Sequence, residues 1–140
     1  MITRSGSAKW QGGLKGGKGT VSTASGALDG LAYGFGTRFE NGPGTNPEEL
    51  VGAAHASCFS MALAMMLEQA GVTGVEIETR SDISLDREGE GFAVKKAHLT
   101  TTIRGDGDPE TLRETAEKAK AGCPISKLLN AEITMEVRLG

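Results

Sequence analysis

The chain has 140 residues, enough for one domain with a hydrophobic core, although 21 glycines and a single Trp leave few large side chains to fill that core. We therefore expect part of its stability to come from a partner subunit. A net charge of −3 and a pI near 5.4 argue against general nucleic-acid binding or membrane-surface binding, because both need a basic face.

Residues 1–4 lead directly into polar, glycine-rich sequence, and Glu68 and Gln69 interrupt the longest apolar stretch. These features are not those of a signal peptide or a transmembrane segment, so we expect a soluble cytoplasmic protein with one domain, residues 1–140. In a reducing cytosol two cysteines are rarely a structural disulfide. Redox catalysis, metal binding and inert core thiols remain as alternatives.

The first 37 residues are rich in Gly, Ser and Thr, and alternating segments at 20–24 and 31–35 favour strands of a meander. Residues 38–45 contain Pro and Gly and predict a loop. Asn46, Pro47 and Glu49 then predict a helix start as N-cap, first helical residue and partner in a capping box. Apolar residues at three- and four-residue spacing continue this helix to a C-terminal cap at Gly71.

Alternating residues at 75–85 and 97–103 predict a hairpin with one buried and one wet face, joined by a turn at 86–91. Asp108, Pro109 and Glu110 open a second helix that runs through Ala121. Residues 124–130 predict a short third helix and 133–139 a last strand. Because helices and strands are grouped, the class is α+β, with mainly antiparallel sheets packed on a long central helix.

Residues 12–20 nearly match a phosphate-binding loop. Gly19 stands where that loop has a hydroxyl residue, however, and no helix is predicted to follow, so the anion site would be incomplete. We expect a flexible connection between two strands.

Cys58 lies midway along the apolar central helix, where burial raises a thiol pKa. A chemical role would therefore demand a nearby cation. Arg38, in the glycine-bearing loop, is the nearest candidate in sequence, and Glu48 could hold its guanidinium by a bidentate contact. The alternatives are that Cys58 is a small core residue and that Glu48 only complements the helix dipole.

Cys123 lies between Gly122 and Pro124 at the start of the short third helix. The positive end of a helix dipole lowers a thiol pKa there, although a plain core position at a chain corner fits the sequence equally well. The contrast between the two settings predicts an attacking thiol, Cys58, and a resolving thiol, Cys123.

His55 and Cys58 are three residues apart on one helix, and with Cys123 and His98 they could supply four metal ligands. The spacing is not typical of zinc sites, so we expect His55 to be a core residue or to support the thiol site. Met61, Met65 and Met66 are interpreted as core packing, with the wall of an apolar ligand site as the alternative.

Four segments, residues 37–40, 42–50, 53–63 and 119–124, resemble the osmotically inducible protein C branch of the OsmC/Ohr peroxidases. The resemblance implies that Cys58 is the peroxidatic thiol, Cys123 the resolving thiol, and Arg38 with Glu48 the activating pair. It also implies an OsmC-like fold, an interwoven homodimer, and reduction of organic hydroperoxides by lipoyl-type dithiols without metal, haem or flavin. A sister branch carries the activating Arg earlier in the chain.

A competing hypothesis is a carrier of lipids or small apolar ligands with a non-catalytic thiol, and another is a zinc protein. For a peroxidase, Phe39, Phe59 and the Met-rich helix predict an apolar approach to Cys58 and a preference for alkyl or aryl hydroperoxides over hydrogen peroxide.

Glu48 and Cys58 are ten positions apart, or ~15 Å along a straight helix, so one Arg38 side chain cannot easily contact both. Either the helix is broken between them, or two subunits complete each site. The unbroken apolar pattern from Leu50 to Leu67 favours two subunits.

Overall fold

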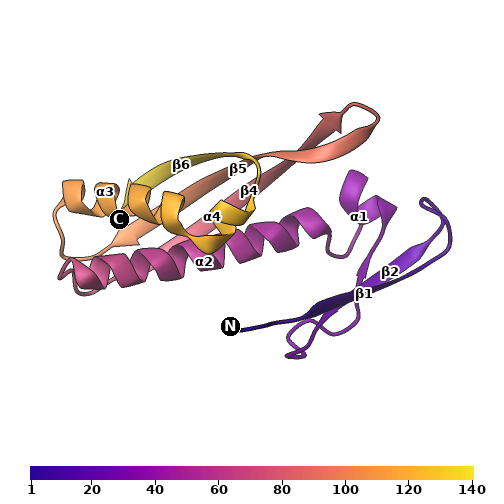
Figure 1. Ribbon diagram of the computed structural model, residues 1–140, viewed down its shortest axis with the longest axis horizontal. Helices are drawn as coiled ribbons and strands as arrows, with labels where there is room; N and C mark the ends of the chain where they lie inside the picture. The colour runs from indigo at the N-terminus through magenta and orange to yellow at the C-terminus, as the bar shows by residue number, and fades with distance from the viewer. The chain divides into compact units, whose positions relative to one another are not determined.

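The computed structural model describes residues 1–140, which form two compact units, residues 1–50 and 51–140. Each unit is described by itself. Figure 1 shows the helices and strands in chain order: β1 (Gly6–Gln11), β2 (Lys18–Thr23), β3 (Leu31–Tyr33), α1 (Phe35–Phe39), α2 (Pro47–Gln69), β4 (Glu76–Glu88), β5 (Gly91–Arg104), α3 (Pro109–Gly122), α4 (Pro124–Leu128) and β6 (Glu132–Leu139). The predicted α+β class is confirmed.

The first unit contains an antiparallel sheet with the order β1-β2-β3, as the meander prediction required. Trp10 and Tyr33 flank Gly19 on the neighbouring strands, with their ring centroids 5.6 Å apart. A side chain at residue 19 would collide with both rings. The glycines of the phosphate-loop-like run therefore permit aromatic packing in a hairpin.

A short helix, α1, occupies the start of the segment that was predicted to be a loop, and Arg38 lies in its last turn. The Thr37 hydroxyl accepts a hydrogen bond from the Gly34 amide at 2.9 Å and donates one to the Gly34 carbonyl at 3.0 Å. These local bonds favour one helical turn in spite of the neighbouring glycines. The loop prediction was wrong for residues 38 and 39.

Helix α2 begins as predicted, because Asn46 Oδ1 accepts a hydrogen bond from the Glu49 amide at 2.8 Å. The Glu49 carboxylate accepts from the Thr45 hydroxyl at 2.7 Å instead of closing the expected capping box. The helix then runs without interruption to Gln69, and Gly71 follows with φ 81°. A break between Glu48 and Cys58 is thereby excluded.

The second unit contains a sheet with the order β4-β5-β6. Strands β4 and β5 are antiparallel and continue through most of the predicted turn, with Asp86 paired to Ala93 and Arg87 to Phe92. Strand β6 is parallel to β5, so the expectation of mainly antiparallel pairing fails for this strand. The reason is topological: α3 and α4 return the chain to the end of the sheet at which β5 began.

The core of the second unit lies on one face of this sheet, where α2 and α3 both pack (Figure 1). The buried residues are Ala97, Leu99, Thr101 and Ile103 from β5, Gly52, His55, Phe59, Leu63 and Leu67 from α2, and Leu112, Ala116 and Ala119 from α3. On β4 and β5, the residues that alternate with the inward-facing ones point to the opposite, polar face of the sheet. The predicted half-buried hairpin is confirmed.

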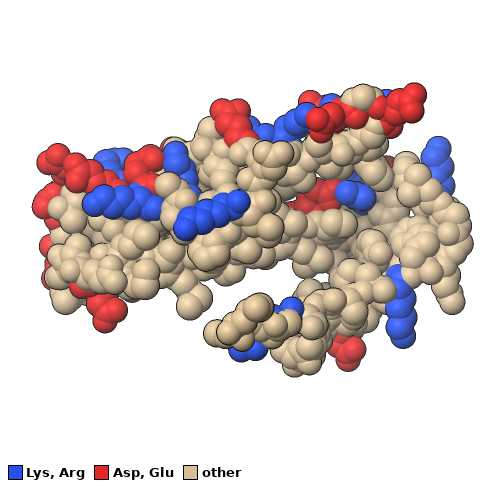
Figure 2. Space-filling view, in the orientation of Figure 1, with Lys and Arg blue, Asp and Glu red and all other residues tan.

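Helix α2 is apolar on all sides, and it carries no Asp, Glu, Lys or Arg between residues 50 and 67. By length and mean hydropathy, 1.7 over 18 residues, it could cross a membrane, but the same composition is typical of a core helix. Figure 2 shows charged side chains of both signs over α3 and along the β4–β5 hairpin instead. One side of α2 packs on the sheet. The other exposes Ala53, Ala54, Ser57, Met61, Ala64 and Met65, here called the exposed α2 face.

Candidate active site

The two cysteines are brought together in the second unit. Cys58 lies on α2, and Cys123 lies at the corner between α3 and α4, where its amide donates to the Ala119 carbonyl at 2.9 Å and its carbonyl accepts from the Lys127 amide at 3.1 Å. Both thiols are free and they hydrogen-bond to each other. Their exposure differs, because Cys58 is partly exposed while Cys123 is fully buried.

Their surroundings shift the two thiol pKa values in opposite directions. Burial raises the pKa of Cys58, and so does its hydrogen bond to Cys123. Burial also raises the pKa of Cys123, but hydrogen bonds from Cys58 and from the amide and hydroxyl of Ser126 outweigh burial and lower that pKa overall. Both predicted directions are confirmed. Within this unit ionisation is therefore easier at Cys123 than at Cys58, and a cation beside Cys58 would be needed to reverse that order.

A buried histidine, His55, lies one turn before Cys58 on α2. Its Nδ1 is 2.8 Å from the Ser81 hydroxyl on β4, and its Nε2 is 2.9 Å from the Ser126 hydroxyl on α4. Burial lowers the pKa of His55 and favours the neutral imidazole. Sequence reasoning placed His55 in the core but missed Ser81 and Ser126. The only signal for Ser81 was its inward-facing place in the alternation of β4.

The predicted activating pair forms an ion pair in the first unit. Arg38 Nε lies 2.7 Å from Glu48 Oε1, and the guanidinium carbon lies 5.5 Å from the centre of the Phe39 ring. The predicted bidentate contact is not present, since Glu48 binds through one oxygen and its buried Oε2 has no hydrogen-bond partner. This arrangement leaves Nη1 and Nη2 of Arg38 outside the salt bridge, where they can bind another anion.

Other candidates are less closely tied to the thiols. Phe59 is completely buried in the core and does not line an approach to Cys58. Met66 packs against the core as expected, but Met61 and Met65 are 76% and 51% exposed, so the core interpretation was wrong for them in a single chain. These two methionines lie three and seven residues after Cys58, on the same side of α2.

The four-ligand metal set is not assembled. His98 lies on the polar face of the sheet, with Nδ1 2.6 Å from the Thr134 hydroxyl, whereas His55 lies on the opposite face. No group of three or more His, Cys, Asp or Glu side chains is arranged to hold an ion. The two thiols contact each other, and Cys123 also contacts Ser126.

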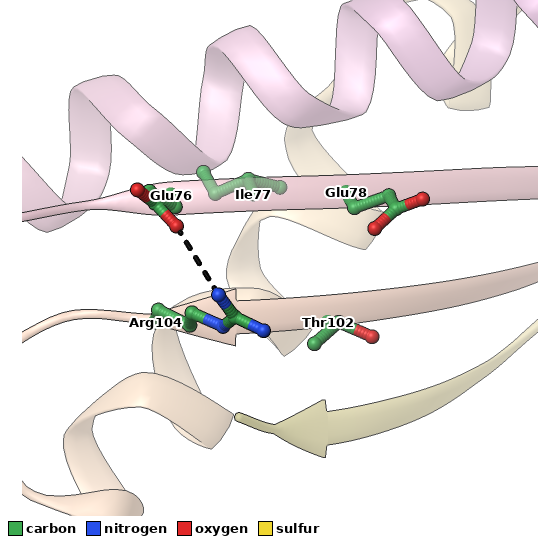
Figure 3. A pocket seen from close by; sticks show the side chains of 5 residues that line it. All are labelled: Glu76, Ile77, Glu78, Thr102 and Arg104. Atoms are coloured by element: carbon green, nitrogen blue, oxygen red, sulfur yellow. Dashed lines mark ion pairs between the residues drawn. The ribbon is translucent and has the colours of Figure 1, made fainter.

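A hollow of about 260 Å³ lies at the end of the β4–β5 hairpin, lined by Glu76, Ile77, Glu78, Thr102 and Arg104. Figure 3 shows Arg104 directed towards Glu76 across the two strands; their charged atoms are 3.5 Å apart. Both side chains are mostly exposed, and neither a thiol nor a histidine lines the hollow. The thiol pair is the stronger candidate for chemistry.

Comparisons with known proteins identify the family of this chain. The sequence model of the family described as OsmC-like protein matches residues 40–138. Peroxiredoxin OsmC of Escherichia coli (strain K12) is 53% identical over 139 residues, which cover 99% of this chain and 97% of that protein.

More distant relatives carry the name of the sister branch. Organic hydroperoxide resistance protein OhrA of Bacillus subtilis (strain 168) is 35% identical over 66% of this chain and 67% of that protein. The crystal structure of OhrB of Bacillus subtilis superposes with a TM-score of 0.69 at 25% identity and covers 96% of this chain and 98% of that chain. The resemblance stated from the sequence is thus confirmed.

Proposed function

Because the chain belongs to the OsmC-like protein family and is a peroxidase of stress defence, we propose that it reduces organic hydroperoxides to alcohols through a Cys58 sulfenic acid and a Cys58–Cys123 disulfide. The observation that carries this proposal is the direct contact between two free thiols of unequal exposure. A hydroperoxide in solution can reach Cys58, whereas fully buried Cys123 is reached only by Cys58.

Arg38 supplies the charge that Cys58 lacks. Burial and the bond to Cys123 hold Cys58 in its thiol form, so a cation beside it is needed to shift the thiolate from Cys123 to Cys58. Glu48 holds Arg38 through Nε and leaves the two terminal nitrogens free of the salt bridge. These nitrogens can stabilise both the thiolate and the alkoxide that leaves when the peroxide bond breaks.

The chemistry then runs in two balanced steps. The Cys58 thiolate attacks the terminal oxygen of ROOH, the O–O bond breaks, and RO⁻ takes up a proton to leave as ROH, which oxidises Cys58 to its sulfenic acid. The Cys123 thiolate next attacks the Cys58 sulfur and forms the S–S bond, while hydroxide leaves and is protonated to water. Two electrons have passed from the thiol pair to the peroxide.

A dithiol must reopen the disulfide by thiol–disulfide exchange, which returns both cysteines to the reduced state. We propose a lipoyl-type dithiol as this reductant and the reducing cytoplasm as the place of the reaction. No resident metal, haem or flavin is required by these steps.

We also propose that the active form is a homodimer in which each site takes Arg38 and Glu48 from one chain and Cys58 from the other. Ten residues of uninterrupted helix, ~15 Å, separate Glu48 from Cys58, so one salt-bridged Arg38 does not easily serve both within a chain. The exposed α2 face also supports a partner subunit. It is built of small and apolar residues, which are unfavourable in water and suited to close helix packing.

The central experiment measures consumption of cumene hydroperoxide in the presence of dihydrolipoamide. Wild type should turn over repeatedly, Cys58→Ser should be inactive, and Cys123→Ser should reduce one equivalent and then stall with Cys58 oxidised. In a parallel reaction without reductant, wild type should lose two thiols per hydroperoxide and Cys123→Ser one. Equal multiple turnover by either variant would reject the assignment, and an apolar-ligand carrier would consume no thiol at all.

A further inference from the structure

A continuous line of hydrogen bonds leads from Ser81 through His55 and Ser126 to the buried sulfur of Cys123. It joins β4, α2 and α4, and the peroxide step makes no use of it. We infer that His55 is a positioning residue that holds the Ser126 hydroxyl towards Cys123 and thereby stabilises the thiolate that attacks the Cys58 sulfenic acid. This inference rests on the proposed resolving role of Cys123.

Proton counting sets the direction of the line. The Ser126 hydroxyl has one proton, and its donation to the Cys123 sulfur lowers the pKa of that thiol. Ser126 must then accept from His55, so Nε2 carries a proton. A neutral imidazole has only one N–H, which leaves Nδ1 bare to accept from the Ser81 hydroxyl at 2.8 Å. Donation from Ser126 to Cys123 thus requires the tautomer in which His55 donates to Ser126, and the Ser81 hydroxyl can donate to Nδ1 in that tautomer.

The site is rigidly built. His55 is completely buried and Ser126 is 7% exposed, so neither can exchange its partner for water. A Cβ at residue 52 would lie 2.7 Å from the Ser81 carbonyl oxygen, so Gly52 allows α2 to approach β4 closely, one turn before His55. Two ordered contacts on opposite ring edges leave the imidazole little freedom to rotate.

Few groups that titrate face this line. The Cys58 thiol on α2 contacts Cys123 directly, and His55 reaches it through Ser126. Ser81 on β4 and Ser126 on α4 are neutral hydroxyls. Cys123 belongs to a buried cluster whose other members are apolar, among them Phe59, Leu63, Leu99 and Ala119. With His55 neutral, the thiol pair is the only part of this line that can carry a charge.

The attack uses this donor as follows. The Cys123 thiolate supplies the electron pair of the new S–S bond, the Cys58 S–O bond breaks, and hydroxide leaves to become water. Before the step, donation from Ser126 favours the thiolate of Cys123 over its thiol. After the step, the Cys123 sulfur is uncharged, and Ser126 loses a strong hydrogen-bond acceptor. The hydrogen bonds from His55 and Ser126 therefore stabilise the reduced pair more than the disulfide.

The test measures the pKa of Cys123 in a Cys58→Ser background from thiolate absorbance near 240 nm. Ser126→Ala should raise this pKa by about one unit, as expected for the loss of a hydrogen bond to a charged group. His55→Leu should raise it less, and the double variant should match Ser126→Ala alone, because His55 acts only through Ser126. His55→Gln retains a donor near Nε2 and should restore the wild-type value.

The rate of disulfide formation provides a second readout, in chains with both cysteines. After one equivalent of cumene hydroperoxide, Ser126→Ala should form the disulfide about threefold more slowly below the Cys123 pKa, since a tenfold loss of thiolate is partly offset by higher nucleophilicity. The pH of half-maximal rate should rise by about one unit. His98→Gln and Ser60→Ala are matched controls, because each removes a hydrogen-bonded group of the same kind away from the thiols.

A Cys123 pKa that is unchanged in folded Ser126→Ala and His55→Leu would overturn the inference, and so would additive effects in the double variant. Circular dichroism and denaturant unfolding establish which variants are folded. If His55→Leu does not fold, His55→Gln still tests the role of His55. The pKa measurement needs no peroxide. A shifted pKa in a protein that shows no peroxidase turnover would therefore reject the proposed function and leave the His55–Ser126 link standing.

Discussion

At the scale of single residues, what matters is how each thiol obtains or lacks a stabilising group. Cys123 has hydrogen-bond donors on α4 within its own unit that lower its pKa, whereas burial and the hydrogen bond to Cys123 raise the pKa of Cys58. The peroxidatic role proposed for Cys58 requires a thiolate, so that proposal depends on a cation brought to Cys58, for which Arg38 is proposed. Two predictions follow from this asymmetry and from the buried histidine beside it.

Arg38→Ala should raise the pKa of Cys58, because an opposite charge within hydrogen-bonding distance lowers a thiol pKa by about one to three units. The rate of sulfenic acid formation at pH 7 should then fall by about tenfold or more. Rapid mixing with cumene hydroperoxide in a Cys123→Ser background measures this rate over pH. Arg80→Ala, which removes an exposed Arg salt-bridged to Asp82, is the control. Identical pH profiles for Arg38→Ala and the parent would contradict the prediction.

Stability should fall as the pH drops below about 6.5, because burial lowers the pKa of His55 in the folded chain. Between the lowered folded pKa and the unfolded value, the unfolded chain binds a proton that the folded chain does not. The free energy of unfolding then decreases with acidification by up to about 1.4 kcal/mol per pH unit.

Denaturant unfolding between pH 7 and pH 5 checks this slope, and His55→Gln should flatten it. In this window Asp106 and Asp108, whose pKa values are lowered by hydrogen bonds from Thr73 and Thr111, remain ionised. The same series on His98→Gln shows whether the loss of any histidine has the same effect. An unchanged slope in His55→Gln would show that His55 is not the group responsible.

At the scale of elements, α2 carries most of the chemistry. Glu48 lies in its first turn. His55 and the buried core side chains point towards the sheet, and Cys58 lies beside the exposed α2 face. A helix that is apolar on all sides is normally buried on all sides. Because the sheet covers only one side, the other side is the part of the molecule that a second chain would cover.

Ala64→Glu, in the middle of the exposed α2 face, should weaken self-association by at least about 100-fold, since it places an unpaired charge in an apolar contact. Ala121→Glu on α3 introduces the same charge at another exposed alanine and should leave association unchanged. Sedimentation velocity over a range of concentrations measures both. Equal association of the two variants would place the dimer contact on another face.

At the scale of the whole molecule, the proposed site is divided between subunits. A mixture of Arg38→Ala and Cys58→Ser chains should therefore recover peroxidase activity after subunit exchange, because each heterodimer contains one complete site. Recovery should approach one quarter of the wild-type activity per chain, since about half of the dimers formed by random exchange are mixed and each has one active site of two. No recovery after verified exchange would mean that each site is built within one chain.

The sequence by itself determined the local structure and the chemical character of the residues. Asn46, Pro47 and Asp108 mark helix starts through backbone geometry within a few positions, and the alternation of β4 and β5 separates a buried from a polar face. The thiol settings could be predicted for the same reason, because burial on an apolar helix and a helix start are local properties. Three local predictions failed: Thr37 supplies hydrogen bonds that outweigh the glycines around α1, most of the predicted turn at 86–91 is strand, and Glu49 binds Thr45 instead of closing a capping box.

Only the tertiary structure decided which distant residues meet. Three contacts join segments that are far apart in the chain. They are the contact of Cys58 with Cys123, the hydrogen bonds of His55 to Ser81 and Ser126, and the parallel pairing of β6 with β5. Such contacts depend on the direction in which α3 and α4 return the chain and on how closely α2 approaches the sheet at Gly52. The local sequence pattern predicts neither the direction of this return nor the closeness of this approach, because the packing of whole elements determines which side chains meet.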